Sequence, residues 1–297
     1  MASDFWPPLP FEEWKDTRET LHMWTQIVGK TRLELCPTEN HWWQVPLYVT
    51  ARGLTTSPIP WGELTFDVEF DFVEHLLRIR TAPGEMRTLA LKPRSVADFY
   101  EAYLAALREL GVDLKLSHPR PDEVSDPIPF AEDRRHSTYD GEAARNFWIV
   151  LTQADRVLKR FRGRFQGKSS PVHFFWGSFD LALTRFSGRR APERPGVDAI
   201  TREAYSHEVL SVGFWPGDSR FPEAIFYAYA APAPAAFEKS RVQPESAFYS
   251  DKMGEFLLRY EDVRKAHSPD DAVLEFAQST YEAGASLGNW DREALER

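Results

Sequence analysis

Residues 170–190, SPVHFFWGSFDLALTRFSGRR, combine side chains that can transfer protons with a dense run of aromatic residues. Such a run, bounded by Pro171 and Gly188, predicts a long buried strand. Buried strands carry few ionisable groups, because each must be hydrogen-bonded or paired to offset its desolvation. A polar stripe within an aromatic strand is typical of the floor of a pocket. The polar members of this stretch are His173, Ser178, Asp180, Thr184 and Arg185.

The regularity of this strand decides which polar groups share a face. In a straight strand, His173 and Asp180 point to opposite sides, and Arg185 shares the side of His173. A bulge at Gly177 would reverse the register and bring His173 to the face of Asp180. The alternative to a pocket is a structural network, in which Asp180 pairs with Arg185 or holds a backbone turn.

These residue types suit acid–base chemistry, which needs a histidine or carboxylate whose pKa is moved towards neutrality in a desolvated pocket. Tryptophans would supply flat apolar walls, and arginines would hold an anionic group through two hydrogen bonds. The pattern therefore predicts an aromatic-lined pocket for a small aromatic or anionic substrate. The predicted catalytic residues are His173, Asp180, His207 and Glu208. The predicted ligand-binding residues are His41, Trp43, Trp176, Ser178, Arg185, Arg189 and Trp215.

Other functions stay open or are disfavoured by the spacing of the motifs. The three histidines His41, His173 and His207 each begin an aromatic stretch and could converge on a metal, but no pair has the close spacing of a metal motif. We therefore assign no metal ligand and no cofactor. The string WGSF around Ser178 lacks the second glycine of a nucleophile elbow, which argues against a serine hydrolase. Whether the protein is an enzyme, or a non-catalytic protein that binds a metabolite or a partner, stays undecided.

The composition is that of a globular chain. Of its 297 residues 42% are hydrophobic, which is enough for a sizeable core, and 27% are charged. The single cysteine, Cys36, excludes an internal disulfide, and no signal peptide or membrane-spanning run is visible. We therefore expect a cytoplasmic protein. The net charge of −9 argues against nucleic acid or an anionic membrane as partners, and a small-molecule ligand is expected instead. The oligomeric state is not predicted.

A basic zone lies on both sides of the aromatic stretch. Between residues 156 and 194 there are ten lysines and arginines but few acids, and Arg160, Arg164 and Arg189 belong to this zone. A solvated helix face explains such a zone. An anion-binding surface is the alternative.

The first half predicts helices from capping residues and strands from alternation. Asp16 can cap a helix that runs to about Val28 and is stopped by Gly29, and a short strand is expected over residues 31–35. Residues 39–53 form a second aromatic stretch, which is expected to be a strand led by His41. Ser95 is expected to cap a further helix that Gly111 ends, and residues 112–116 to form a short strand.

Residues 64–72, LTFDVEFDF, alternate between apolar and polar side chains and predict the most regular strand. The apolar set points inward, while Asp67, Glu69 and Asp71 are expected to face water. These acids are interpreted as solvated strand residues and not as metal ligands. Strands over residues 76–81 and 88–91 are expected to follow.

The second half repeats this order. Asp140 is expected to cap a helix with Trp148 on it, and the aromatic stretch led by His173 follows. Strands are expected near residues 207–215 and 224–229, and helices after Pro244 and Pro269. We predict an α+β fold with two similar halves, each an antiparallel sheet with flanking helices, and an internal duplication would account for the shared order. The predicted boundaries are residues 1–117, a Pro-rich crossover at 118–140 that spans the halves or covers a site, and residues 141–297.

Four segments carry a resemblance to a known family. They are SPVHFFWGSFDLALTRFSGRRAP, LYVTARGLTTSPIP, PFAEDRRHSTYD, and REAYSHEV followed by GFWPG. Together they resemble a bacterial family of unknown function, domain-of-unknown-function family 5996. The resemblance covers nearly the whole chain and implies a bacterial protein built as a single module. It implies no activity and assigns no role to any residue.

Overall fold

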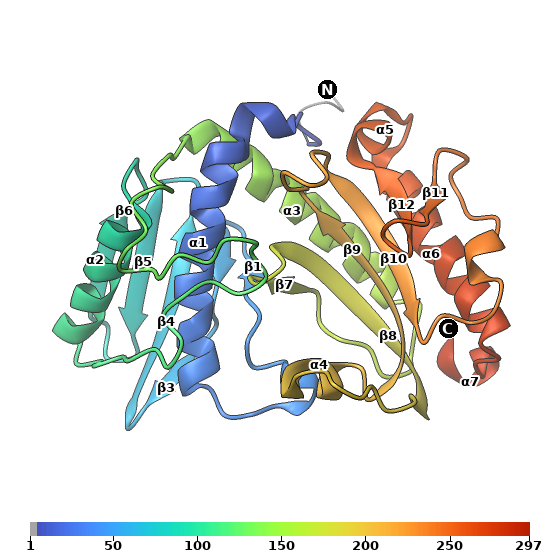
Figure 1. The fold of residues 1–297 in the computed structure, drawn as a ribbon, viewed down its shortest axis with the longest axis horizontal. Coiled ribbons are helices and arrows are strands. Elements are labelled where there is room, and N and C mark those ends of the chain that lie inside the picture. The colour runs from blue at the N-terminus through green and yellow to red at the C-terminus, as the bar shows by residue number, and fades with distance from the viewer. Residues whose placement is uncertain (1–4) are drawn as a thin grey trace.

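The computed structural model describes residues 5–297 and shows an α+β fold with two antiparallel sheets of six strands each (Figure 1). The strands of sheet 1 are β1 (Tyr48–Val49), β2 (Gly53–Thr55), β3 (Ile59–Trp61), β4 (Leu64–Asp71), β5 (Leu76–Thr81) and β6 (Met86–Ala90). The strands of sheet 2 are β7 (His173–Phe175), β8 (Asp180–Arg190), β9 (His207–Trp215), β10 (Ile225–Ala231), β11 (Phe248–Ser250) and β12 (Glu255–Arg259). The α-helices are α1 (Phe11–Leu35), α2 (Val96–Glu109), α3 (Gly141–Arg162), α4 (Ala199–Ala204), α5 (Tyr260–Lys265), α6 (Pro269–Leu287) and α7 (Arg292–Leu295). Two 3₁₀ turns, η2 (Asn40–Trp42) and η3 (Phe237–Lys239), complete the fold.

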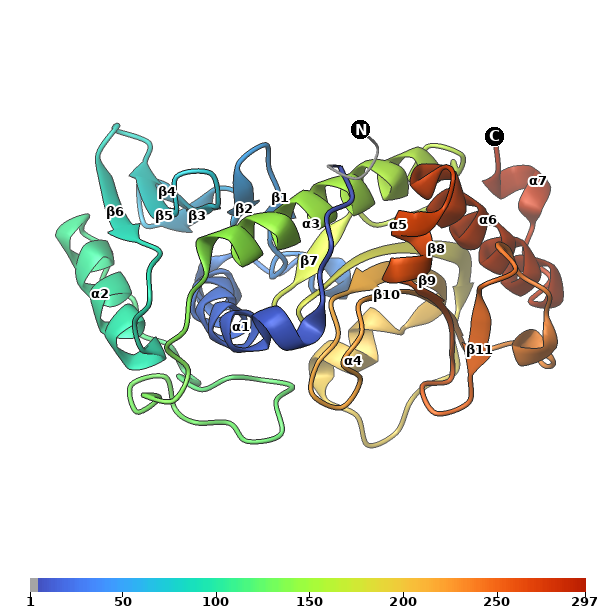
Figure 2. The same ribbon diagram turned by 90° about the horizontal axis from the view of Figure 1, so that it is seen from above.

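The two halves share one order of elements, as predicted, but the helix expected after Pro244 is wrong, because that segment forms strands β11 and β12. In each half a long helix precedes an antiparallel sheet, and a further helix follows it: α1 and α2 enclose sheet 1 in the sequence, and α3 and α6 enclose sheet 2. The sheet orders are β1-β2-β4-β5-β6, with β3 on β4, and β7-β8-β9-β10-β12-β11. In the view of Figure 2, α1 and α2 lie below sheet 1, whereas α3 lies above sheet 2.

The halves are joined where the first strand of each sheet lies. Leu47 and Phe174 form a single antiparallel bridge, and both of its N–H···O distances are 2.9 Å. Helices α1 and α3 also pack together, with the rings of Trp14 and Phe147 5.1 Å apart. One hydrophobic core therefore runs through both halves.

Helix α1 differs from the prediction because it does not stop at Gly29. It runs without a break from Phe11 to Leu35, so the short strand expected over residues 31–35 is wrong. Gly29 lies inside the helix at its contact with Trp176, where a Cβ atom would come within 2.2 Å of the indole. The glycine is needed for close approach of a distant side chain and not for a helix end.

The aromatic stretch over residues 170–190 is a hairpin and not one long strand. Strands β7 and β8 pair with His173 opposite Ala182 and Phe175 opposite Asp180. The turn between them ends at Phe179, which has a positive φ of 62°. This turn, and not a bulge, places His173 on the face of Asp180. The alternation along β8 puts Arg185 on the other face, so the pairing of Asp180 with Arg185, considered as an alternative to a pocket, does not occur.

Three further expectations meet different outcomes. Ser95 and Asp140 cap α2 and α3, accepting hydrogen bonds from Asp98 N (3.1 Å) and Ala143 N (2.9 Å), as predicted. Residues 39–53 contain η2, β1 and the start of β2, so His41 is in a 3₁₀ turn and does not begin a strand. Residues 112–116 form no strand, because they pair with no neighbour in the described chain.

Strand β4 alternates as predicted, but part of its acidic face is buried. The apolar side chains of Phe66, Val68 and Phe70 are at most 2% exposed. Asp71 is fully buried, and its carboxylate accepts hydrogen bonds from Arg52 Nε (2.7 Å) and Arg78 Nε (3.1 Å). The expectation that all these acids face water is therefore wrong, because arginines from neighbouring segments cover the sheet.

Candidate functional site

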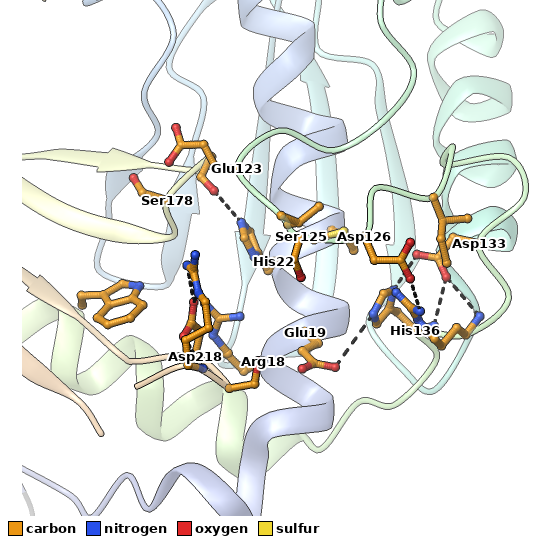
Figure 3. A pocket seen from close by; sticks show the side chains of 18 residues that line it. Arg18, Glu19, His22, Glu123, Ser125, Asp126, Asp133, His136, Ser178 and Asp218 are labelled. Carbon is orange, nitrogen blue, oxygen red and sulfur yellow. Dashed lines mark hydrogen bonds and ion pairs between the residues drawn. The ribbon is translucent and has the colours of Figure 1, made fainter. Parts of the chain in front are cut away.

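A cavity of about 420 Å³ lies at the junction of the two halves (Figure 3). Its walls come from α1, from the crossover segment, from the turn between β7 and β8, and from the connection that follows β9. Figure 3 shows Ser178 and Glu123 at one end of the cavity and His136 with Asp133 at the other. Eight of the eighteen lining residues are acidic or arginine, and Trp215 is the one tryptophan among them. The cavity thus differs from the aromatic-lined pocket expected from the sequence.

Arg18, in the second turn of α1, is a buried cation that lines this cavity. Its side chain lies over Phe179, with 5.3 Å between the guanidinium carbon and the ring centroid. The residue is only 6% exposed, yet it has no ion pair and no hydrogen bond among residues 5–297, and its buried Nε has no partner. Burial lowers the pKa of Arg18 to about 10, so the group stays charged at neutral pH. Arg18 thus forms no direct ion pair in the cavity, although the nearby carboxylates of Asp218 and Glu19 oppose the lowering of its pKa.

Asp133 and His136 form a carboxylate–imidazole pair on the crossover segment. His136 Nδ1 lies 2.6 Å from Asp133 Oδ2, and Asp133 also accepts the backbone N–H groups of Arg135 and His136. Burial opposes ionisation of Asp133, but the hydrogen bonds from His136 hold its pKa below the ordinary value. An ionised carboxylate at Nδ1 fixes the proton there, so Nε2 carries the lone pair. His136 Nε2 lies 3.9 Å from Glu19 on α1, which also lines the cavity.

His22, one turn beyond Arg18 on α1, has a structural contact instead. Its Nε2 donates to Gly177 O at 2.8 Å, and its ring packs at a tilt against Phe179 with centroids 4.9 Å apart. Burial, and then the charge of Arg18, lower the pKa of His22 to about 3. The imidazole is thus neutral at physiological pH and holds the turn between β7 and β8 against α1.

Ser178 and Trp215 are the two residues from the predicted site that line this cavity. Ser178 donates its hydroxyl hydrogen bond to Asp180, and Tyr227 donates to the other oxygen of the same carboxylate. Burial raises the pKa of Asp180, although these two hydrogen bonds oppose the shift. Asp180 therefore fixes the orientation of Ser178 from behind the cavity wall.

Trp176 and His173 are enclosed by the protein. Trp176 packs against Gly29 of α1, and its indole donates to Val45 O at 2.8 Å. His173 is 1% exposed, with its ring 5.4 to 5.8 Å from those of Trp43, Tyr48 and Phe175. Neither of its ring nitrogens has a partner among the described residues, and burial lowers its pKa to about 3. It lines neither this cavity nor the cavity of about 250 Å³ beside Arg189.

His41, Trp43 and His207 lie together at a separate place. The ring of His41 is 5.4 Å from that of Trp43 and 5.7 Å from that of His207. Trp43 separates this pair of histidines from His173. Within residues 5–297, no three His, Cys, Asp or Glu side chains are arranged to hold a metal ion.

The arginines of the basic zone mostly have partners. Arg185 is buried on the opposite face of β8, 3.4 Å from the centroid of Phe161, and it donates to Phe161 O. Arg189 pairs with Glu208 at 2.6 Å beside a second cavity of about 250 Å³. Arg160 lies 3.5 Å from Asp270 at the start of α6. Of the four predicted catalytic residues, Glu208 lines this second cavity and none lines the first.

Only weak sequence signals point to the residues that surround the cavity. The crossover segment was expected to span the halves or cover a site, and Asp133 and His136 belong to it. Arg18 and His22 are four residues apart, which places them on one helix face. Nothing near them in the sequence shows that this face meets the turn from the other half.

The fold and the cavity together define a two-sheet α+β protein with a polar cavity between its halves. The chain matches the family of unknown function DUF5996 over residues 6–297 and therefore belongs to that family. Neither a curated protein nor a solved structure matches it. The family assignment thus supports the resemblance seen in the sequence and brings no activity with it. None of the helices in residues 5–297 is both long and apolar enough to cross a membrane.

Proposed function

We propose that this protein binds a small anionic molecule in the cavity between its halves and acts on it by histidine–carboxylate acid–base chemistry. The observation that carries the proposal is Arg18, a buried and unpaired guanidinium at the cavity wall. An unpaired buried charge destabilises the folded state by several kcal/mol. A ligand that supplies the counter-charge would offset this destabilisation.

The pairing of the other arginines of this cavity distinguishes Arg18 from them. Arg220 is paired with Asp218 at 2.6 Å, and Arg135 is paired with Asp126 at 2.7 Å. Arg18 is thus the arginine of this cavity without an acidic partner among the described residues. A planar guanidinium binds carboxylate or phosphate groups through two hydrogen bonds, and a volume of about 420 Å³ suits a small molecule.

The pair formed by His136 and Asp133 is the proposed acid–base group. Asp133 fixes the tautomer in which Nε2 can accept a proton, and the ionised carboxylate stabilises the imidazolium that forms. Glu19, close to Nε2, would hold a protonated His136. This assignment keeps the predicted type of chemistry but transfers it to residues on the crossover segment.

The residues expected from the sequence keep a part in this proposal. Ser178 and Trp215 would contact the ligand, and Asp180 would orient Ser178. Catalytic roles for His173, His207 and Glu208 stay predictions without a shared cavity to support them. A cytoplasmic location and an origin by internal duplication likewise stay part of the proposal.

The binding step is tested by thermal melts in phosphate, sulfate and citrate against sodium chloride of equal ionic strength. Ligands that bind the folded state raise the melting temperature as their concentration increases. We expect this rise in the wild type and in Arg145→Met, an exposed arginine of α3, but not in Arg18→Met. Equal stabilisation of Arg18→Met and the wild type would contradict the proposal. Without added anion, Arg18→Met should be at least as stable as the wild type, because it removes an unpaired charge.

The catalytic step is tested with a mixture of carboxylate- and phosphate-containing metabolites followed by mass spectrometry. We expect one component to be consumed by the wild type, and its consumption to be lost in His136→Gln while that component still raises the melting temperature. Binding without consumption by the wild type would favour the non-catalytic, metabolite-binding alternative.

A further inference from the structure

A second reactive group lies outside the cavity, in the segment between α3 and β7. Lys168 Nζ is 2.7 Å from His41 Nε2, and His41 Nδ1 is 3.1 Å from Glu203 O. Since a carbonyl oxygen can only accept, Nδ1 carries the proton and donates to Glu203. The lone pair on Nε2 therefore faces the lysine and accepts its hydrogen bond.

Two aromatic rings flank the Lys168 amine, and no carboxylate among residues 5–297 forms an ion pair with it. Lys168 Nζ lies 5.3 Å from the ring centroid of Trp43 and 4.9 Å from that of Phe186. No carboxylate of residues 5–297 lies within 4.0 Å of it, whereas Lys159 has Asp155 at 2.7 Å. Burial lowers the pKa of Lys168, while the carboxylate of Glu12 raises the pKa of Lys15. The side chain is nevertheless exposed to solvent and open to reagents.

We propose that Lys168 is a nucleophilic amine that forms an imine with a planar aldehyde or ketone bearing an anionic group. Trp43 and Phe186 offer flat apolar surfaces beside Nζ. Arg190 is the ladder partner of His207 between β8 and β9, and burial together with the charges of Lys168 and Arg190 lowers the pKa of His207, so Arg190 supplies positive charge in this region. This proposal is independent of the cavity and of Arg18.

His41 accepts and returns the proton that is transferred during the condensation. Its Nε2 takes one proton from the Lys168 ammonium, and the free amine then adds to the carbonyl carbon to give a carbinolamine. The protonated His41 returns its proton to the carbinolamine hydroxyl, which leaves as water while the C=N bond forms. One ammonium and one carbonyl thus give one protonated imine and one water, with no oxidant or reductant.

The probe for this reaction is pyridoxal 5′-phosphate, a planar anionic aldehyde, at limiting concentration and pH 7, followed by borohydride reduction. Peptide mass spectrometry then gives the extent of modification at every lysine of the intact protein. We expect Lys168 to be modified at least about threefold faster than Lys159, since Asp155 holds the Lys159 ammonium whereas Lys168 has no carboxylate partner and donates to His41. Equal or slower modification of Lys168 would overturn the proposal.

Two variants separate the contribution of His41 from simple accessibility. His41→Asn removes the imidazole while tolerating the positive φ of 59° at this position, and it should slow the modification of Lys168 without changing that of Lys159. Lys168→Arg should abolish the fast phase. An unchanged rate at Lys168 in a folded His41→Asn protein would show that His41 takes no part. The comparison of lysines within the wild type needs no variant and stands even if His41→Asn fails to fold.

Discussion

Arg18 and His173 are both buried polar side chains without partners, but their surroundings give them different meanings. The guanidinium of Arg18 lines a cavity, so a ligand can complete its hydrogen bonds. The imidazole of His173 is enclosed by the rings of Trp43, Tyr48 and Phe175, so a ligand cannot complete its hydrogen bonds. We therefore expect substitution at the two positions to have different effects on stability and binding.

For His173, replacement by phenylalanine should leave the protein unchanged or stabilise it by about 1 kcal/mol, because a buried polar group without partners is costly. His173→Ala should instead lower the free energy of unfolding by about 1–3 kcal/mol, since it leaves a cavity among the rings. Urea unfolding of the three proteins measures both changes. A loss in His173→Phe as large as in His173→Ala would show that the ring nitrogens have partners in solution.

The neutral histidines also predict how stability depends on pH. Burial lowers the pKa of His22 and of His173 to about 3, whereas an unfolded histidine titrates near 6.5. Between these values the unfolded state binds more protons, so stability is complete above pH 6.5 and falls as the pH decreases towards 3. Each histidine should contribute about 1.4 kcal/mol per pH unit.

Urea unfolding at pH 7, 6 and 5 checks this dependence, because most carboxylates stay ionised over that range. His173→Phe should show a slope smaller by the contribution of one proton. Stability independent of pH in the wild type over the same range would contradict the assignment of these two histidines as neutral.

At the scale of elements, α1 and the turn between β7 and β8 are fitted to each other. Trp176 and Phe179 of the turn pack on α1, and Gly177 O accepts the hydrogen bond from His22. The turn thereby carries Ser178 to the cavity wall, opposite the crossover segment. The geometry of the proposed site depends on this contact between halves.

Gly29→Ala tests the contact. Alanine favours an internal helix position by about 1 kcal/mol, but its Cβ would lie 2.2 Å from the indole of Trp176. We expect a net loss of about 1–3 kcal/mol in the free energy of unfolding, as for other overpacked sites. Gly163→Ala is the control, because its nearest neighbour would lie 3.5 Å from the Cβ. Stabilisation by Gly29→Ala to the same degree as by the control would show that the turn is not seated on α1.

For the whole molecule, the continuous core argues that the halves unfold together. The main hydrophobic cluster contains residues of both halves, from Trp24 and Phe66 to Phe214 and Phe276. The bridge between Leu47 and Phe174 adds backbone hydrogen bonds between the sheets. The boundaries predicted at residues 117 and 140 therefore separate parts of one structural unit.

Differential scanning calorimetry should show one transition, with equal calorimetric and van't Hoff enthalpies. Ala substitution of Phe179, which packs between α1 and the second half, should move this single transition to lower temperature. Two resolved transitions, of which only one moves, would contradict the common core.

The sequence by itself determined the features that depend on residues close together in the chain. The alternation of Phe66, Val68 and Phe70 predicts β4, and Ser95 and Asp140 predict the starts of α2 and α3. Repetition of such local patterns was enough for the α+β class and its two halves. Each of these depends on side-chain periodicity or on a cap that bonds within three residues.

Only the tertiary structure decided the features that depend on contacts between distant segments. In the sequence, Gly29 predicts a helix end. In the structure, Trp176 from the other half occupies the space beside it, inside the helix. In the sequence, Asp71 is predicted to be a solvated strand residue, whereas in the structure Arg52 and Arg78 cover it. Arg18 gains significance only because the crossover segment and the turn at Ser178 form a cavity around it. Local periodicity cannot specify these contacts, because burial and pairing are properties of segments that meet after folding.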